Sequence, residues 1–264
     1  MKFKEFDAKM RVYEEADDHC ILPGIHMVVR LDGRNFTRLT KEVWELNRPF
    51  DIRFSNWMLA TTKHVMDCGF RTVYAYTQSD EISLLLHRDD VAFERKDRKL
   101  LSILASEATA EFNSYVMDGA PHYGTFDARI SQLPSEQHVV DYFRWRQSDA
   151  RRNARNAHVY WFLRDQHKLS PKRADKAAAG MSFDDKKQFL LEHGRDPDKL
   201  PPWQSRGTGV WWKKVQHAGV DPRTNETKHV WRTRLHVADL PEGDEYGEFI
   251  ADLLQPQARV ELLA

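Results

Sequence analysis

The chain has 264 residues, and 41% of them are apolar, which suits one large domain or one domain with a substantial appendage. No stretch approaches the ~20 apolar residues of a membrane helix, and the charged start, Met1–Glu5, lacks an apolar signal region. We therefore expect a cytoplasmic protein with no membrane segment. Cys20 and Cys68 are the only cysteines, and the absence of a CxxC spacing argues against a disulfide framework and a structural zinc site.

Acidic and basic residues balance at 40 each, so the net charge favours no class of partner. Their distribution says more, because the segment from Arg144 to Lys176 is strongly basic, with Asp149, Asp165 and Asp175 as its only acids. A basic face on a neutral protein favours a polyanion bound at one place. An ordinary solvated helix face would show the same pattern.

The N-terminal half alternates between strand and helix patterns. The predicted elements are a strand at His26–Gly33, a helix at Asp51–Asp67 capped by Asp51, strands at Arg71–Thr77 and Ile82–His87, a helix at Asp97–Met117 and a strand at Thr125–Ile130. Four polar residues separate the two middle strands, which indicates a hairpin. The order βαββαβ predicts an α+β, ferredoxin-like fold, with helices on one face of an antiparallel sheet.

The C-terminal half has a different character. It contains predicted helices at Glu136–Leu163, Lys168–Gly194 and Asp244–Leu254, and predicted strands at Gly209–Val215 and Lys228–Arg234 around a loop with Asp221 and Pro222. We therefore divide the chain into a sheet unit at 1–135 and a helical and β-hairpin extension at 136–264 packed on it. Four tryptophans of the extension could stack on bases or belong to the core or an oligomer interface: Trp203, Trp211, Trp212 and Trp231.

Three carboxylates fall where this topology brings strand ends together. Asp32 ends the first strand, and Asp80 and Glu81 occupy the hairpin turn, so all three are expected at one edge of the sheet. Converging carboxylates repel one another unless a cation lies between them, and magnesium with phosphate suits such oxygen ligands. Two such ions could activate an attacking oxygen at a phosphoryl centre. Each acid alone could equally be an ordinary turn residue.

Residues suited to phosphate binding surround these acids in the sequence. Gly33–Thr37 follows the first strand, where glycine permits close approach of a ligand to the backbone, and Ser79 adds a hydroxyl. Basic residues gather where the second helix begins, at Arg95, Lys96, Arg98 and Lys99. Cations there oppose the helix dipole unless an anion is bound, so we expect a triphosphate nearby, with ordinary surface charge as the alternative.

Four blocks of the chain resemble the signature blocks of the tRNA-histidine guanylyltransferase family, and in particular its bacterial and archaeal "like" branch. They are Val29–Phe36, Tyr76–Glu81, Phe126–Arg129 and Asp141–Asp149, and they occur in the family's order. The resemblance covers most of residues 5 to 215. It implies a nucleotidyltransferase that acts at the 5′ end of tRNA in the 3′ to 5′ direction, built on a palm domain similar to that of polymerases and nucleotide cyclases.

The resemblance also implies roles for individual residues. Asp32 and Asp80 would bind two Mg²⁺ ions with the Gly33 carbonyl as a further ligand, and Glu81 matches an acid that the family needs. The nucleotide would be contacted by Asp32, Gly33, Arg34, Asn35, Phe36, Thr37, Arg48, Ser79, Asp80, Lys96 and Lys99. In the family reaction ATP activates a 5′-monophosphate, or a triphosphate end reacts directly, and the 3′-hydroxyl of an incoming nucleotide such as GTP attacks it. Family members assemble as homotetramers.

One block departs from the family pattern. Eukaryotic members carry His-Ile-Asn-Asn-Leu-Tyr-Asn where this chain has Arg151–Ala157, which keeps only Asn153. The resemblance is therefore to the branch that repairs truncated tRNA 5′ ends with the opposite strand as template. Asp149 is the only close acid in sequence, so we expect Arg151, Arg152 and Arg155 to be unpaired cations that contact tRNA phosphates, with Asn153 on the same RNA-binding surface.

Two other functions are compatible with parts of this pattern. A nucleotide cyclase or cyclic-dinucleotide synthase would share the palm and the two metals, but would not need the basic block near Arg151. A non-catalytic RNA-binding protein would need that block, but would leave Asp32, Asp80 and Glu81 as an acidic cluster without a purpose.

Overall fold

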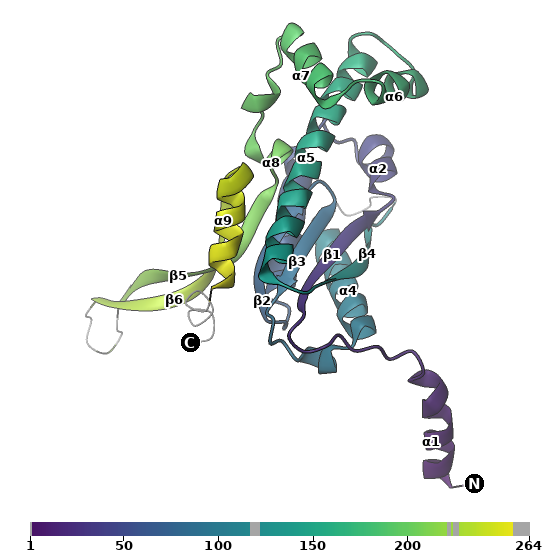
Figure 1. The fold of residues 1–264 in the computed structure, drawn as a ribbon, viewed down its shortest axis with the longest axis vertical. Helices are drawn as coiled ribbons and strands as arrows, with labels where there is room; N and C mark the ends of the chain where they lie inside the picture. Colours follow the sequence, from purple (N-terminus) through teal and green to yellow (C-terminus); the bar gives the residue numbers. More distant parts are fainter. Residues whose placement is uncertain (1, 117–121, 221–222, 224–226, 256–264) are drawn as a thin grey trace.

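The computed structural model describes residues 2–116, 122–220, 223 and 227–255. Its centre is one antiparallel sheet of six strands in the order β4-β1-β3-β2-β5-β6 (Figure 1). The strands are β1 (His26–Arg34), β2 (Thr72–Gln78), β3 (Glu81–Leu86), β4 (Thr125–Leu133), β5 (Thr208–Val220) and β6 (Thr227–Asp239). The first four strands, with helices α3 (Ile52–Met66) and α4 (Asp97–Tyr115), form the predicted βαββαβ unit. The expected α+β fold class is confirmed.

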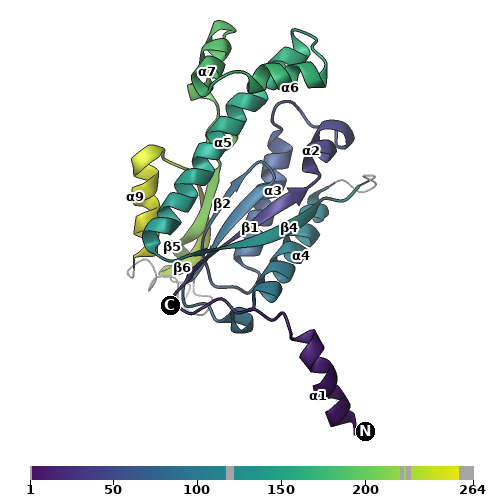
Figure 2. The same ribbon diagram turned by 45° about the vertical axis from the view of Figure 1, so that its right-hand side comes forward.

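Helices α3 and α4 cover one face of the sheet, as the ferredoxin-like pattern predicts (Figure 2). Alternation along β1 directs Val29 and Leu31 into this layer, where both are fully buried. Helix α3 begins where expected, because the Asp51 side chain accepts a hydrogen bond from the Arg53 amide. The predicted end of α4, Met117, lies outside the described residues.

The opposite face is covered by the extension. Helices α5 (Glu136–Asp165) and α9 (Gly243–Leu254) lie across it (Figure 2). Val28 of β1 faces this layer and packs in a cluster with Phe143 of α5 and Tyr246 of α9. The sheet is therefore buried on both faces, and α5 passes over the strands that carry the predicted acids.

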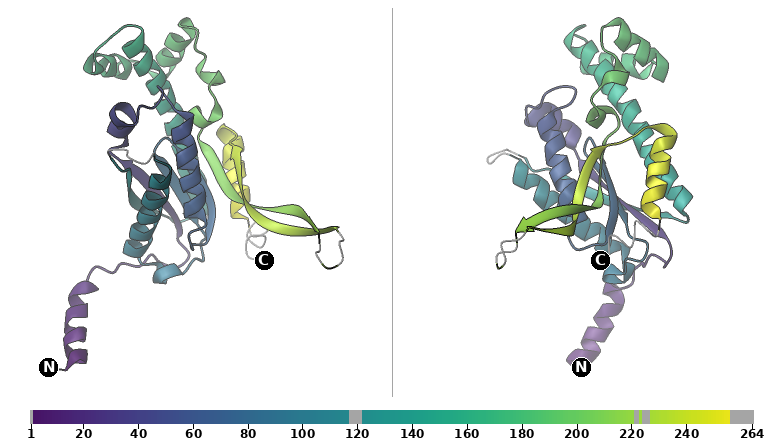
Figure 3. Two further views of the ribbon diagram at one scale, coloured as in Figure 1. Left: turned by 180° about the vertical axis from the view of Figure 1, so that it is seen from behind. Right: turned by 90° about the vertical axis from the view of Figure 1, so that its left-hand side faces the viewer.

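The predicted C-terminal hairpin is present and longer than expected. Strand β5 pairs with the β2 edge from Tyr74↔Trp211 to Thr77↔Thr208, so the hairpin extends the palm sheet. Its outer part projects beyond the body of the molecule (Figures 1 and 3). Trp211 and Trp212 pack partly buried against the core, whereas Trp231 is 67% exposed. The predicted loop residues Asp221 and Pro222 lie outside the described residues.

Smaller elements complete the fold. The segment expected to be helical near Lys168–Gly194 forms two helices, α6 (Pro171–Ala179) and α7 (Phe183–Glu192), because Ser182 caps a new start. Short turns are α2 (Phe36–Arg38), η1 (Leu39–Val43), η2 (Ala92–Arg95), η3 (Pro197–Lys199) and α8 (Pro202–Ser205). Helix α1 (Phe3–Glu14) projects from the body without a buried residue (Figure 3). No helix in the described part of the chain is long and apolar enough to cross a membrane.

Candidate active site

The structure brings the three predicted acids to one edge of the sheet. Asp32 and Glu81 are direct partners across the β1–β3 ladder, so their side chains share the face toward α5. Asp80 precedes Glu81 in the hairpin turn, and its carbonyl accepts a hydrogen bond from the Gly33 amide at 3.0 Å. Backbone register therefore places Asp32 beside Glu81 and Gly33 beside Asp80, which are 49 and 47 positions apart in sequence.

Gly33 is required at this edge by close packing. A Cβ atom at this position would lie 2.6 Å from the Phe36 ring and 2.9 Å from the Asp80 Cβ. Phe36 is buried at the centre of an aromatic cluster that includes Phe112 and Phe126, so it cannot move away easily. A side chain at position 33 would push the β1 end away from Asp80.

Charge at this edge is only partly compensated. The pKa of Asp80 is raised to about 6, mainly by burial and in addition by the neighbouring carboxylates of Asp32 and Glu81. Among the described residues, no ion pair to Asp80 is formed, and its ionised form is assisted by a hydrogen bond from its own backbone amide and by the Ser79 hydroxyl. A cation between Asp32 and Asp80 would relieve this unfavourable state.

The donor set fits magnesium with one correction. Carboxylates of Asp32 and Asp80 and the Gly33 carbonyl are hard oxygen donors of the kind that Mg²⁺ prefers. Within the described residues, however, no group of three or more histidine, cysteine, aspartate or glutamate side chains forms a metal site. The part of the chain that the structure describes therefore does not gather all three carboxylates around one cation position, and both oxygens of Glu81 are held by arginines.

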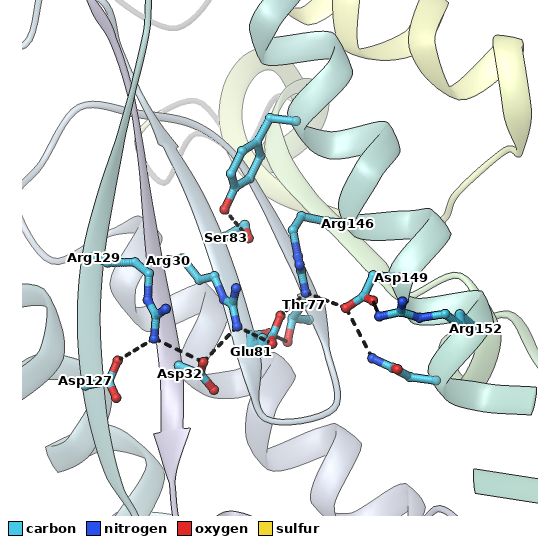
Figure 4. A network of polar contacts seen from close by, with 12 residues as sticks. Arg30, Asp32, Thr77, Glu81, Ser83, Asp127, Arg129, Arg146, Asp149 and Arg152 are labelled. Carbon is cyan, nitrogen blue, oxygen red and sulfur yellow. Dashed lines mark hydrogen bonds and ion pairs between the residues drawn. The ribbon is translucent and has the colours of Figure 1, made fainter. Parts of the chain in front are cut away.

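Glu81 belongs to a row of alternating charges that runs from the sheet to α5 (Figure 4). Its Oε1 accepts from Arg30 at 2.6 Å and its Oε2 from Arg146 at 2.5 Å. Arg30 also donates to Asp32 at 2.8 Å, and Arg146 to Asp149 at 3.1 Å. We call these five residues the charge ladder. Its guanidinium groups hold both carboxylate oxygens of Glu81.

A cavity of about 370 Å³ opens beside the hairpin turn. It lies between the β2–β3 turn, the segment from α2 to the start of α3, and the C-terminal half of α5. Its lining includes the predicted residues Phe36, Thr37, Arg48, Ser79, Asp80, Glu81 and Asn153. Asp32, Gly33, Arg34 and Asn35 lie on the adjoining strand end and turn and do not line it.

Cations over aromatic rings form the far wall of this cavity. The Arg48 guanidinium lies 4.2 Å from the Trp161 ring centroid, and Lys41 Nζ lies 4.9 Å from the Tyr160 centroid. Neither cation has a carboxylate partner in the described part of the chain. Lys41, Tyr160 and Trp161 were not predicted from the sequence. The adjacent residues Tyr160 and Trp161 indicate a base-binding wall only when α5 is known to pass the acidic edge of the sheet.

Lys96 and Lys99 are not brought to this cavity. Lys96 pairs with Cys20, which precedes β1, whereas Asp32 lies at the other end of that strand, roughly 20 Å away. The Lys96 ammonium is neutralised by Asp18 at 3.1 Å, and Arg98 also pairs with Asp18. The anion that we expected beside the cations at the start of α4 is therefore Asp18, a residue of the chain itself. Within one chain, the expectation that both lysines contact a triphosphate at Gly33–Thr37 is wrong.

The arginines of α5 are paired, contrary to expectation. Arg151 binds Glu242 at 2.9 Å, and Arg155 binds Asp198 at 3.1 Å; both line a second cavity of about 180 Å³. Arg155 is only 6% exposed and also packs on the Phe183 ring at 3.6 Å. Arg152 and Asn153 both bind Asp149 but remain exposed. The predicted compact face of free cations is therefore wrong, because acids distant in sequence reach Arg151 and Arg155.

Comparison with known proteins gives consistent matches along the chain. A family model described as tRNAHis guanylyltransferase matches residues 7–134, and one described as Thg1 C terminal domain matches residues 137–239. A mouse protein named probable tRNA(His) guanylyltransferase is 32% identical over 238 residues, covering 86% of this chain and 79% of that protein. The tRNA(His) guanylyltransferase of Neurospora crassa is 32% identical over 241 residues, covering 88% and 80%.

Solved structures agree with these matches. A bacterial tRNA(His) guanylyltransferase (Thg1)-like protein in complex with ATP superimposes with a TM-score of 0.74 and 26% identity, covering 94% of this chain and 98% of that one. A complex of such a bacterial protein with GTP gives a TM-score of 0.71. The Saccharomyces cerevisiae tRNA(His) guanylyltransferase gives 0.68, covering 76% and 91%.

Proposed function

Because the chain belongs to the tRNA(His) guanylyltransferase family and is a nucleotidyltransferase, we propose that it adds nucleotides to tRNA 5′ ends in the 3′ to 5′ direction. The observation that carries the proposal is the placement of Asp32 and Asp80 at the edge of the 370 Å³ cavity. Acids for a metal, cations for phosphates and aromatic rings for a base adjoin one another there. Similar bacterial proteins are described in complex with ATP and with GTP, and we propose both as ligands here.

The residues around the cavity have distinct tasks in this proposal. Asp32, Asp80 and the Gly33 carbonyl hold two Mg²⁺ ions, which would stabilise charge on the phosphoryl oxygens and lower the pKa of the attacking hydroxyl. Backbone groups of residues 33–37 and the Ser79 hydroxyl orient the phosphates. Arg48, which lies on the Trp161 ring, adds a cation to the same wall.

The reaction follows from this arrangement. The 3′-hydroxyl of the incoming nucleotide forms a new phosphodiester bond with the tRNA 5′-phosphate. The leaving group is AMP when the end was adenylylated with ATP, and pyrophosphate when the end is a triphosphate. The enzyme therefore contributes mainly orientation and charge stabilisation.

We propose templated repair because the block Arg151–Ala157 lacks most of the family's eukaryotic pattern. Asn153 lines the cavity and Arg152, one position earlier on α5, is 68% exposed at its side chain. Both can meet RNA that enters beside the nucleotide. Arg151 and Arg155 support this surface through their ion pairs with Glu242 and Asp198.

We also propose that the chain works as a homotetramer, with residues 1–135 as the palm and 136–264 as its extension. Apolar side chains of α1 support assembly, since Phe3 and Tyr13 are 80% and 72% exposed. In such an assembly, Lys96 and Lys99 can contact a nucleotide only at the site of a neighbouring copy. Nucleotide binding by the two lysines would thus depend on assembly, because they lie far from the cavity of their own chain.

The test uses 5′-truncated tRNA with a label at its 3′ end, incubated with the protein, Mg²⁺ and all four nucleoside triphosphates. We expect products extended at the 5′ end, whose added bases are complementary to the opposite strand of the acceptor stem. A second tRNA with one altered base opposite the gap serves as the matched control. Addition of G regardless of that base would contradict templating, and no 5′ extension on either tRNA would contradict the proposed activity.

A further inference from the structure

The charge ladder contains a buried cation that sequence patterns did not single out. Arg146 lies on α5 and is 5% exposed. Its Nη2 lies between Glu81 Oε2 at 2.5 Å and Asp149 Oδ2 at 3.1 Å, and its guanidinium carbon lies 4.6 Å from the Trp145 ring centroid. The side chain is therefore fixed by two carboxylates and an aromatic ring.

Arg30 holds the corresponding position on the sheet. Its Nη2 lies between Asp32 Oδ2 at 2.8 Å and Glu81 Oε1 at 2.6 Å. Each carboxylate oxygen of Glu81 thus receives its own guanidinium group, one from the sheet and one from α5 (Figure 4). A metal ion at Glu81 would have to share the carboxylate oxygens with these two guanidinium groups, whereas Asp32 keeps its Oδ1 outside this network.

We infer that Glu81 and Arg146 are positioning residues of the metal site, with Arg146 holding Glu81, Glu81 holding Arg30, and Arg30 fixing the Asp32 carboxylate. The inference rests on the proposed function, since it concerns the metal held by Asp32 and Asp80. In this inference Glu81, the acid that matches the family pattern, orients the metal ligand Asp32 and does not coordinate the metal itself.

The sign of the effect follows from how Arg30 is shared. Glu81 takes part of the hydrogen-bonding capacity and the positive charge of Arg30, so Asp32 retains more of its negative charge for a cation. In Glu81→Gln, Asp32 becomes the one carboxylate in the ion pair of Arg30 and is neutralised more fully, while Arg129, 3.5 Å from Asp32 Oδ2, is the same in both proteins. Cation affinity should then fall although Glu81 touches no cation.

The ladder also joins the two parts of the chain. Arg146 lies within the segment 137–239 and Glu81 within 7–134, which match separate family models. A buried contact between Tyr142 and Ser83 hydroxyls at 3.3 Å holds α5 against β3 beside the ladder. Arg146 of the extension thereby helps to orient Glu81, which belongs to residues 1–135.

The experiment measures Mn²⁺ binding by electron paramagnetic resonance, without nucleotide, so that activity is not the readout. Glu81→Gln is prepared in the wild-type background and in Arg30→Met. We expect about a tenfold loss of Mn²⁺ affinity in the first background and less than a twofold change in the second, because the effect passes through Arg30. Arg144→Met, which removes an exposed arginine two residues from Arg146, is the control and should bind Mn²⁺ normally.

A second arm guards against misfolding of Arg30→Met. Arg146→Met leaves Glu81 with Arg30 as its only partner, and Glu81→Gln should have a different effect on affinity in that background than in the wild type. Equal losses in every background would identify Glu81 as a direct ligand and overturn the inference, and no loss in any background would also overturn it. If Asp80→Asn binds Mn²⁺ like the wild type, the metal site of the proposed function fails instead.

Discussion

The acidic edge of the sheet and the arginine block of α5 both concentrate like charges, and among the described residues the edge keeps one acid, Asp80, without an ion pair. At the edge, burial and two neighbouring carboxylates raise the pKa of Asp80 to about 6, with no cationic partner in the described residues. On α5, Arg151 and Arg155 reach Glu242 and Asp198. Charge that remains uncompensated after folding points to a ligand, whereas compensated charge supports the fold.

The largest expected difference between the two regions is in activity. Asp32→Ala and Asp80→Ala should each reduce nucleotide addition by on the order of a thousandfold or more, because each removes a metal-binding carboxylate. The measurement is single-turnover addition to truncated tRNA at saturating Mg²⁺. Asp244→Ala, which removes an exposed acid paired with Arg144, should retain normal activity. Near-normal rates in either site variant would show that the assignment is wrong.

The second comparison concerns stability on α5. Arg155→Met should lower the free energy of unfolding by about 1–2 kcal/mol, because it removes the bond from a buried guanidinium to Asp198, which keeps Lys187 as a partner, and the packing on Phe183. Arg152→Met, whose side chain is 68% exposed, should change it by less than about 0.5 kcal/mol. Urea denaturation distinguishes the two. Equal values would mean that Arg155 is not part of the structural framework.

Removal of the Asp80 charge should have the opposite effect on stability and raise the free energy of unfolding. Its folded pKa is raised, so ionisation destabilises the metal-free protein as the pH rises through about 6, and this penalty is absent below the ordinary pKa near 3.8. Asp80→Asn should therefore raise stability at pH 8 by on the order of 1–2 kcal/mol, with the gain vanishing near pH 4. Thermal melts in EDTA across this range provide the test. A variant less stable than the wild type at pH 8 would contradict the uncompensated charge.

The smallest expected effect is on RNA affinity. Arg152 is the accessible arginine of the block, but Asp149 competes for it, so Arg152→Ala should flatten the dependence of log K on log salt by at most about one unit. Filter binding of tRNA at several salt concentrations gives the slope. Arg144→Ala is the control on the same helix. An unchanged slope would remove Arg152 from the RNA interface.

The parts predictable from sequence were those set by neighbours along the chain. The strand ending at Asp32, the turn at Asp80 and the cap at Asp51 follow from local patterns, and the βαββαβ order then places both acids at one edge. The same topology also determines where α4 begins. Strand β3 runs away from the hairpin turn at Asp80, so α4 must start at the opposite end of the sheet. The distance of Lys96 from the acids could therefore have been predicted.

Other features depend on contacts that no local pattern reveals. The pair of Arg155 with Asp198 joins α5 to a turn 43 residues later, and that of Arg151 with Glu242 spans 91 positions. The aromatic wall at Trp161 becomes part of the cavity only because α5 is long enough to pass the sheet edge. Ion pairing of Glu81 depends likewise on Arg146 from that helix.

The central claim is that Asp32 and Asp80 hold metal and triphosphate together at the large cavity. A crystal structure with Mn²⁺ and a non-hydrolysable GTP analogue tests it most directly. We expect anomalous Mn²⁺ peaks at the Asp32 and Asp80 carboxylates, and phosphates between residues 33–37 and Ser79. Manganese coordinated by Glu81 with Arg30 or Arg146 displaced, or a triphosphate bound away from this edge of the sheet, would contradict it.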